Sequence, residues 1–382
     1  MEPEDPSDQL PQEVASLENL TVVTPSMEPQ YEFTFNREQA FGEIYGQVQF
    51  GTSPYLRSAV DAQGRVIIPN ESEKYINVYD SSGTKITTLG REGRGPGEFT
   101  SLYHMGIIGD EIYATFASGI GINFFSLDSL VSTHTLYLEP ELENIIRDSA
   151  TWLIQSPRFY RTVDGKSLLA AYRDYDKKET PQDHRLKFYL LNREGRFSSD
   201  LLLEMRSDEK FTLDMGGNFP GRGILTDLPV SLKSLIDVDS NALIYYARTD
   251  TPLVKVRDTT GTYRKAFYLD LPRVETRADD VISLADNGDF LAGGIRKMDL
   301  RPLWPAFDSM IIDDDDRIWI STVIEDFEVY RWWVLDTEGN LLARFDWPRD
   351  KPIRYIRDDH IYTRETNEER YIDEIVRYRI IQ

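Results

Sequence analysis

Residues 90–99, GREGRGPGEF, contain four glycines and two arginines, a composition that could bind phosphate. A P-loop, however, needs Lys and Ser or Thr directly after its glycines, followed by a helix. Here Gly97 is followed by Glu98 and Phe99, and no helical pattern follows, which also argues against a dinucleotide-binding fingerprint. Pro96 lacks the backbone N–H that an anion-binding loop would use. We therefore interpret the segment as a tight corner, with Phe99 filling a gap between two repeats.

Five arginines are the candidates for a ligand-binding site. Three of them recur where a predicted second strand ends, namely Arg173, Arg248 and Arg364. The other two, Arg91 and Arg94, lie in the glycine-rich corner. A guanidinium group suits the recognition of a carboxylate, and these side chains together would form a basic opening. The alternative is that each arginine pairs with a neighbouring acid, and the excess of 65 Asp and Glu over 43 Lys and Arg favours it.

No catalytic or metal-binding constellation is apparent in the sequence. The four histidines share no spacing, no G-x-S-x-G occurs, and the absence of cysteine excludes thiolate catalysis and disulfides. The run DDDD at 313–316 is contiguous, whereas calcium-binding loops alternate their ligands, so we favour a solvated turn. We assign no catalytic residue, no metal and no cofactor.

A repeated unit of four strands would position these candidates. Turns of the form Asp-x-x-Gly or Asn-x-x-Gly lie between strand-like stretches: Asp80–Gly83, Asn192–Gly195, Asp258–Gly261 and Asp336–Gly339. A second tight turn lies upstream in each unit, and the units start near residues 55, 102, 158, 232, 307 and 353. Six antiparallel units of this kind predict an all-β, six-bladed β-propeller.

Three segments outside these units complete the predicted organisation. The last unit has only three strands before the chain ends, and we expect the extended, aromatic residues 31–41 to supply the fourth strand. Residues 273–303 partly fit a helical stripe and are expected to form an insertion. Residues 1–30 are predicted to be a flexible acidic tether, which leaves 31–382 as the propeller.

The chain resembles the NHL-repeat propellers and bacterial six-bladed β-propeller proteins. GREGRGPGEF with SLYHMGIIGDEIYA resembles the NHL connector, RVIIPNESEKYINVYDSSG resembles a blade core, and PAFDSMIIDDDDRIWIS is similar to a late blade. The resemblance covers roughly residues 31–382, and the turns depart from the pattern in the second and third units. It implies the fold and, because many such proteins are exported, an extracytoplasmic location, but its motifs are mostly structural.

Charge and hydropathy limit the partners. A net charge of −22 repels nucleic acid and anionic lipid, so neither is expected to bind. No apolar run approaches the roughly 18 residues of a membrane-spanning helix. The acidic N-terminal stretch is typical of the segment after the cleavage site of an exported protein or lipoprotein, and equally of an ordinary frayed terminus. Lipid anchoring through a removed N-terminal segment is one expectation that follows.

Two functions are compatible with this sequence. The favoured one is an exported, non-catalytic binding propeller of the periplasm or cell surface. It would recognise a protein, peptide or glycan on the face that carries its long loops. Those loops are predicted at 138–157, 173–185, 204–231 and 270–305. The alternative is a metal-dependent lactonase- or lyase-like enzyme with a site at the central channel.

Overall fold

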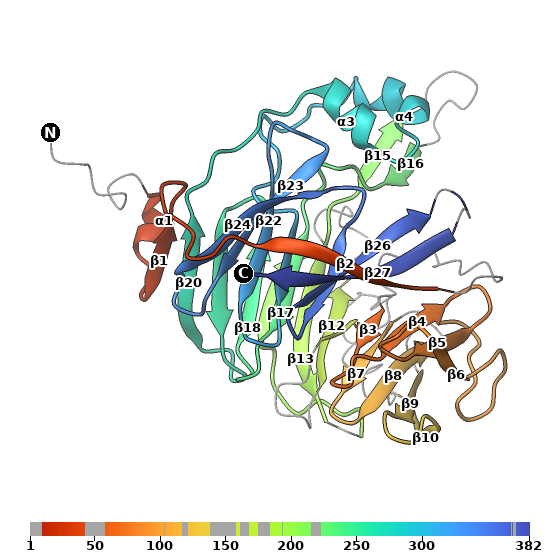
Figure 1. Cartoon of the computed structure of the whole chain (residues 1–382). Coiled ribbons are helices and arrows are strands. Elements are labelled where there is room, and N and C mark those ends of the chain that lie inside the picture. Colours follow the sequence, from red (N-terminus) through yellow and green to blue (C-terminus); the bar gives the residue numbers. More distant parts are fainter. Residues whose placement is uncertain are drawn as a thin grey trace, which may run out of the picture.

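Each predicted strand–turn–strand unit forms one antiparallel sheet, and six such sheets are arranged as the blades of a propeller (Figure 1). The computed structural model describes residues 10–42, 58–102, 104–116, 121–137, 158–160, 168–174, 184–192, 194–214, 223–367, 369 and 372–382. Four strands build each blade, and one blade carries a fifth strand at its outer edge. The predicted all-β, six-bladed architecture is confirmed.

The first three blades follow one another along the chain. Blade 1 consists of β3 (Ala59–Val60), β4 (Val66–Asn70), β5 (Tyr75–Tyr79) and β6 (Lys85–Leu89). Blade 2 consists of β7 (Met105–Ile108), β8 (Glu111–Phe116), β9 (Gly121–Ser126) and β10 (Ser132–Tyr137). Blade 3 consists of β11 (Arg158–Tyr160), β12 (Leu168–Asp174), β13 (Arg185–Leu191) and β14 (Leu203–Arg206).

The other three blades complete the ring. Blade 4 consists of β17 (Ser234–Val238), β18 (Ile244–Arg248), β19 (Leu253–Arg257) and β20 (Tyr263–Leu269). Blade 5 consists of β21 (Ser309–Ile312), β22 (Ile318–Val323), β23 (Val329–Leu335) and β24 (Leu341–Pro348). Blade 6 consists of β25 (Ile353–Arg357), β26 (His360–Asn367), β27 (Ile372–Ile381) and the N-terminal β2 (Thr34–Phe41).

Strand β2 closes the ring as the sequence predicted. It pairs antiparallel with β27, from Thr34 opposite Ile381 to Phe41 opposite Ile375. Figure 1 shows β2 beside β27, although the two lie at opposite ends of the chain. Phe41 is fully buried and packs in one cluster with residues of blade 1 and blade 6. The N-terminal strand therefore completes blade 6 and joins it to blade 1.

Aspartate and asparagine side chains shape the turns. Asp80 Oδ1 accepts the backbone N–H groups of Ser82 and Thr84, both at 2.9 Å. Asp336 makes the same pair of bonds to the residues two and four positions later, at 2.9 Å each. Such bonds fix a tight reversal, and Gly83 and Gly339 supply the positive φ that follows (86° and 89°). These local rules explain why the hairpins could be located from sequence.

The glycine-rich corner behaves as predicted. Gly90 and Gly97 both have positive φ (69° and 73°). A Cβ atom on Gly90 would collide with the ring of Phe99. Phe99 is fully buried, and its cluster includes residues of blade 1 and blade 2. The segment is thus a crossing between blades that Phe99 anchors in the gap.

The N-terminal segment has more structure than the predicted tether. It contains the short helix α1 (Gln12–Ala15) and the strand β1 (Leu20–Val23), which pairs parallel with β20 at the edge of blade 4. The N–H groups of Gln30 and Tyr31 then donate to the carbonyls of Leu341 and Leu342 in β24 (3.1 and 2.8 Å). We call residues 11–31 the N-terminal strap, because they cross the outer edges of blades 4 and 5 before β2 enters blade 6. The strap forms because exposed strand edges offer unpaired backbone groups.

A small cap lies outside the blades. It consists of the hairpin β15 (Phe211–Asp214) and β16 (Gly223–Thr226) with the helices α3 (Ala278–Leu284) and α4 (Gly288–Ile295). Figure 1 shows the four elements together at the top. The helices lie within 273–303, where the sequence predicted helical structure, whereas the hairpin lies in a segment expected to be a loop. The helices of the described residues all fall short of the length and hydropathy that a membrane-spanning helix requires.

Candidate functional site

The two faces of the propeller differ in how they are built. The short turns inside the hairpins share one face, which we call the turn face. The loops between second and third strands, and the crossings between blades, share the other, which we call the loop face. Its described parts include the crossings 207–214, 223–233, 270–308 and 349–352. The predicted loop 138–157 and most of 173–185 lie outside the described residues.

The cap packs on the loop-face end of blade 5. Its own core contains Leu213 from the hairpin and Val281 from α3, and Phe327 and Tyr330 of blade 5 pack against that core. An ion pair ties the cap to the crossing from blade 3, since both carboxylate oxygens of Glu209 accept from Arg301 Nη2 (2.8 and 2.7 Å). The cap is thereby held against the residues that form the cluster described next.

A cluster of charged and aromatic side chains lies beside the cap. Its four members come from distant positions in the sequence, on blades 4 and 5 and on the crossing into blade 6: Lys233, Asp308, Tyr330 and Arg349. Lys233 and Asp308 each directly precede an innermost strand, β17 and β21. Tyr330 is the second residue of β23 and Arg349 directly follows β24, so the propeller brings all four to the loop face. We call this set the Arg349 cluster.

The backbone around the cluster is fixed by hydrogen bonds. The N–H of Lys233 donates to Thr249 Oγ1 at 2.8 Å, and the N–H of Asp308 donates to the carbonyl of Ser321 at 2.8 Å. The N–H of Arg349 donates to the carbonyl of Glu328, also at 2.8 Å. Each cluster residue therefore projects from a backbone segment bonded to a neighbouring strand or loop.

The guanidinium of Arg349 is held by aromatic rings. It lies 4.2 Å from the ring centroid of Tyr330 and 5.9 Å from that of Phe327. Its Nε and Nη2 atoms are buried and have no hydrogen-bond partner among the described residues. A buried donor without a partner costs about 1–3 kcal/mol, and more when it is charged. An acceptor placed at these two nitrogens would remove that penalty.

Asp308 is the acid of the cluster and is already paired. Lys233 Nζ lies 2.8 Å from Asp308 Oδ1, and the Tyr330 hydroxyl also bonds to this carboxylate. Burial acts to raise the pKa of Asp308, but the charges of Lys233 and Arg349 outweigh it and hold the pKa below its usual range. Burial, followed by the charge of Asp308, raises the pKa of Tyr330, which therefore stays protonated as a donor at neutral pH.

The cluster is suited to binding an anion. Lys233 and Arg349 supply two positive charges against the single negative charge of Asp308. The net charge of the cluster is therefore positive, although the net charge of the protein is −22. A guanidinium presents its N–H groups in the planar fork that matches a carboxylate, and stacking on Tyr330 fixes that fork. The arrangement is therefore chemically able to hold a carboxylate.

Two of the sequence-predicted arginines, Arg91 and Arg364, bond to a nearby acid. Arg91 Nε donates to Glu98 Oε1 at 2.8 Å, and Arg94 is exposed on the same corner. Arg364 Nε donates to Asp373 Oδ2 at 2.9 Å, within blade 6. The backbone of Arg173 lies in β12 opposite Leu186, and its side chain is outside the described part.

Arg248 bridges two blades. Its Nη1 donates to the carbonyls of Arg206 and Ser207 (3.1 and 2.8 Å) and to Ser234 Oγ (3.1 Å). Burial lowers the pKa of Arg248, although nearby carboxylates, with Asp250 the strongest, oppose this effect. Its Nε has no hydrogen-bond partner among the described residues. Arg248 therefore links the second strand of blade 4 to the chain that leaves blade 3.

The run of four aspartates connects blades on the turn face. Asp316 accepts the N–H and hydroxyl of Ser240 in blade 4 (2.7 and 2.6 Å), and Asp314 accepts the N–H of Asp358 in blade 6 (3.1 Å). Asp313 is fully buried and accepts from Arg317 Nε and Trp319 Nε1 (2.6 and 2.7 Å). The solvated turn that we predicted is thus partly buried. Among the described residues, no three His, Asp or Glu side chains are grouped to hold a metal ion.

No member of the Arg349 cluster was predicted from the sequence. Lys233, Asp308, Tyr330 and Arg349 are separated by up to more than a hundred positions, and no local spacing joins them. The repeat positions did carry one indication of the site. The residue before each innermost strand must lie on the loop face, where that strand begins. Lys233 and Asp308 occupy this position in adjacent blades. Listing such positions from the predicted repeats would have placed these two residues side by side.

Comparison with known proteins supports the architecture. No protein-family model matches the sequence, and no curated protein matches it significantly. A protein of Bacteroides fragilis named "Putative exported protein" aligns with a TM-score of 0.51 and 11% identity, over 95% of this chain and 100% of that chain. A member of the DUF4221 family from Bacteroides vulgatus aligns with a TM-score of 0.53 and 10% identity, over 92% and 99% of the two chains. At these identities the similarity shows the fold alone.

Proposed function

We propose that this protein is an exported, non-catalytic binding propeller whose loop face recognises a carboxylate of a protein, peptide or glycan partner. The observation that carries the proposal is the Arg349 guanidinium, which stacks on Tyr330 and has two buried nitrogens without a hydrogen-bond partner among the described residues. These nitrogens are covered by the protein, so a partner carboxylate would accept from them once the covering side chains move, and it would then complete the bonding of the cluster.

The expected strength follows from the geometry. A hydrogen bond to a charged group contributes about 1.5–3 kcal/mol, which corresponds to roughly one to two decades of affinity. Stacking on Tyr330 holds the guanidinium in place before the partner arrives, so little conformational entropy is lost on binding. Lys233, which is bonded to Asp308, adds a favourable charge. The remaining affinity would come from contacts with the cap and the surrounding loops.

The sequence-predicted arginines are proposed to act at the same face. Arg248 and Arg364 lie in the second strands of blades 4 and 6, and Arg173 lies in the second strand of blade 3. Arg91 and Arg94 lie on the crossing from blade 1 to blade 2. Their proposed role is to extend the basic opening around the Arg349 cluster, with Arg248 the leading member because its Nε retains a free N–H among the described groups.

Export is the second part of the proposal. It is supported by the acidic N-terminal stretch, by the resemblance to bacterial propellers, and by the name of the Bacteroides fragilis protein that shares the fold. The proposed location is the periplasm or the cell surface, with lipid anchoring through a removed N-terminal segment. The NHL-like character of the repeats is likewise proposed from the residues quoted above. The strong negative charge supports a partner other than nucleic acid.

An array experiment tests the proposed function. The purified full-length chain is applied to immobilised acidic glycans and to peptides with free carboxylates, each beside its amide or neutral counterpart. We expect selective binding to acidic members, and Arg349→Gln should reduce that binding about tenfold or more. Arg264→Gln is the matched control, because Arg264 is an exposed arginine on β20 of blade 4. Equal binding to acidic and neutral members, or an unchanged signal in Arg349→Gln, would contradict the proposal.

A further inference from the structure

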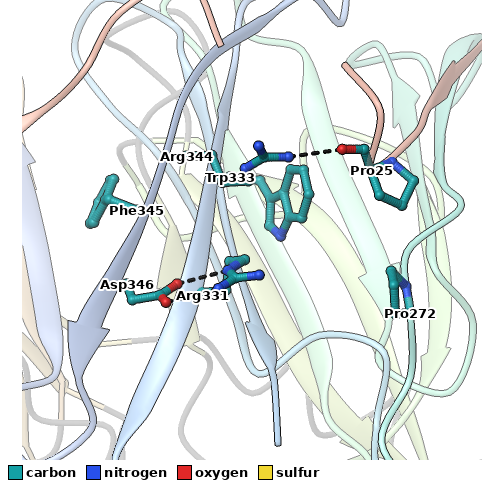
Figure 2. Close-up of a pocket in the computed structure, with 7 residues that line it drawn as sticks. All are labelled: Pro25, Pro272, Arg331, Trp333, Arg344, Phe345 and Asp346. Atoms are coloured by element: carbon teal, nitrogen blue, oxygen red, sulfur yellow. Dashed lines mark hydrogen bonds and ion pairs between the residues drawn. The ribbon is translucent and has the colours of Figure 1, made fainter. Parts of the chain in front are cut away.

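A pocket of about 450 Å³ opens between blades 4 and 5, and none of its lining residues belongs to the Arg349 cluster (Figure 2). Its volume falls within the roughly 300–1,000 Å³ of typical small-molecule sites. The N-terminal strap, the chain after β20, and blade 5 each contribute to its lining. The residues that matter here are Pro25, Pro272, Arg331, Trp333, Arg344 and Asp346.

The blade-5 side of the pocket is one face of a sheet. Arg331 is directly opposite Asp346, and Trp333 is directly opposite Arg344, on the neighbouring strands β23 and β24. Because alternate residues of a strand point to the same side, both pairs share a face. Figure 2 shows Trp333 and the two guanidinium groups on one side of the gap, with Pro25 and Pro272 across from them. The pocket thus combines apolar and cationic surfaces.

Both arginines are already oriented by the protein. Arg331 Nε and Nη2 donate to the two oxygens of Asp346 (2.7 and 2.8 Å), and these bonds raise the pKa of Arg331. Arg344 lies 5.2 Å from the ring centroid of Trp333, and its Nη1 donates to the carbonyl of Pro25 at 2.9 Å. A guanidinium has five N–H donors, so these bonds leave further donors on each group. Two cations face a single carboxylate in this pocket.

We propose that this pocket is a second ligand site, for a small molecule that carries one carboxylate on a ring-shaped body. The carboxylate would accept the remaining N–H groups of Arg331 and Arg344 and balance the excess positive charge. The ring would pack against Pro25 and Pro272, which are exposed and form the opposite wall. Aromatic acids and sugar acids share this chemistry, and the test separates them.

The N-terminal strap is part of this site. Pro25 lies between β1, which pairs with β20, and Gln30 and Tyr31, which donate to the edge of β24. Arg344 fixes the strap at the pocket through the carbonyl of Pro25. One wall of the site therefore comes from a segment that the propeller does not need for closure. A ligand bound there would hold the strap and blade 5 together.

Calorimetric titration of the full-length protein tests the proposal. The probes are phenylacetate and glucuronate, with 2-phenylethanol and glucose as their neutral counterparts. We expect one of the two acids to bind saturably and its neutral counterpart to bind at least about tenfold more weakly. Binding by phenylacetate would identify an aromatic acid, and binding by glucuronate a sugar acid. No preference for either acid over its neutral counterpart would overturn the proposal.

Variants locate the binding on the protein. Arg344→Gln should weaken the binding of the acid about tenfold. Arg344→Lys keeps the positive charge and should retain part of the affinity, which would also show that the fold tolerates substitution at this position. Arg264→Gln and Arg349→Gln should leave this binding unchanged, the latter because its site is separate from the pocket. Acid binding that is lost in Arg349→Gln but kept in Arg344→Gln would refute this pocket as the site without contradicting the proposed function of the loop face.

Discussion

The replacement of Phe41 by alanine tests how the ring is closed. Phe41 is the last residue of β2, is fully buried, and packs with Val60 and Ile68 of blade 1 and Tyr362 of blade 6. Removing a fully buried phenylalanine side chain costs about 3–5 kcal/mol, because apolar contacts are lost and a cavity remains. A loss of this size is a large fraction of the stability of a typical domain. We therefore expect a clearly lower denaturation midpoint for Phe41→Ala.

The matched control is Phe290→Ala. Phe290 lies on α4 and is 64% exposed, so its removal should change stability by no more than about 0.5 kcal/mol. Equilibrium unfolding in urea, followed by tryptophan fluorescence and by circular dichroism, gives the midpoint of each variant. The account of closure fails if Phe41→Ala unfolds at the same urea concentration as Phe290→Ala.

Three further predictions concern other parts of the molecule. Arg248→Ala should destabilise the protein by about 1–3 kcal/mol, because two carbonyls of the chain leaving blade 3 lose their donor, and thermal unfolding beside Arg264→Ala measures it. An unchanged melting temperature would count against the bridging role. The folded protein lowers the pKa of Asp308, so the ionised Asp308 carboxylate stabilises the fold. This stabilisation is present at pH values above the ordinary carboxyl range and is lost as the pH falls through the pKa of Asp308 in the folded state. The melting temperatures of wild type and Asp308→Asn should therefore differ most above about pH 5, and the difference should shrink as the pH falls below the ordinary carboxyl range. Elemental analysis after dialysis should find calcium and zinc well below one ion per chain, whereas a stoichiometric metal would favour the lactonase- or lyase-like alternative.

The repeats could be predicted from sequence because their rules are local. Asp80 and Gly83, or Asp336 and Gly339, lie three positions apart and fix a turn without help from the rest of the chain. Counting such turns gave six blades and showed that the last lacked a strand, which left residues 31–41 as the one extended segment able to close it. Phe99 could be assigned for a similar reason, since burying an aromatic side chain is favourable and the glycine corner lies beside the gap between two blades.

The strap and the Arg349 cluster depend on the assembled ring and could not be predicted in the same way. Strand β1 pairs with β20 because the edge of blade 4 is free where the N-terminal segment passes. The four residues of β1 are too few to carry a sequence pattern that identifies β20 as their partner. Lys233, Asp308 and Arg349 meet because blades 4, 5 and 6 are neighbours. Arginines that looked equivalent by repeat position, such as Arg248 and Arg364, instead have different local partners.

Arg349 is proposed to donate to a carboxylate at the loop face, and its side chain can be observed directly. In a nitrogen-15 TROSY spectrum of the full-length protein, the Nε–H signal of Arg349 is assigned as the one missing in Arg349→Gln. We predict that titration with acetate shifts this signal saturably and leaves the Nε–H signal of Arg264 in place. An Arg349 signal that stays unchanged up to saturating acetate, or that moves no more than that of Arg264, would contradict the account.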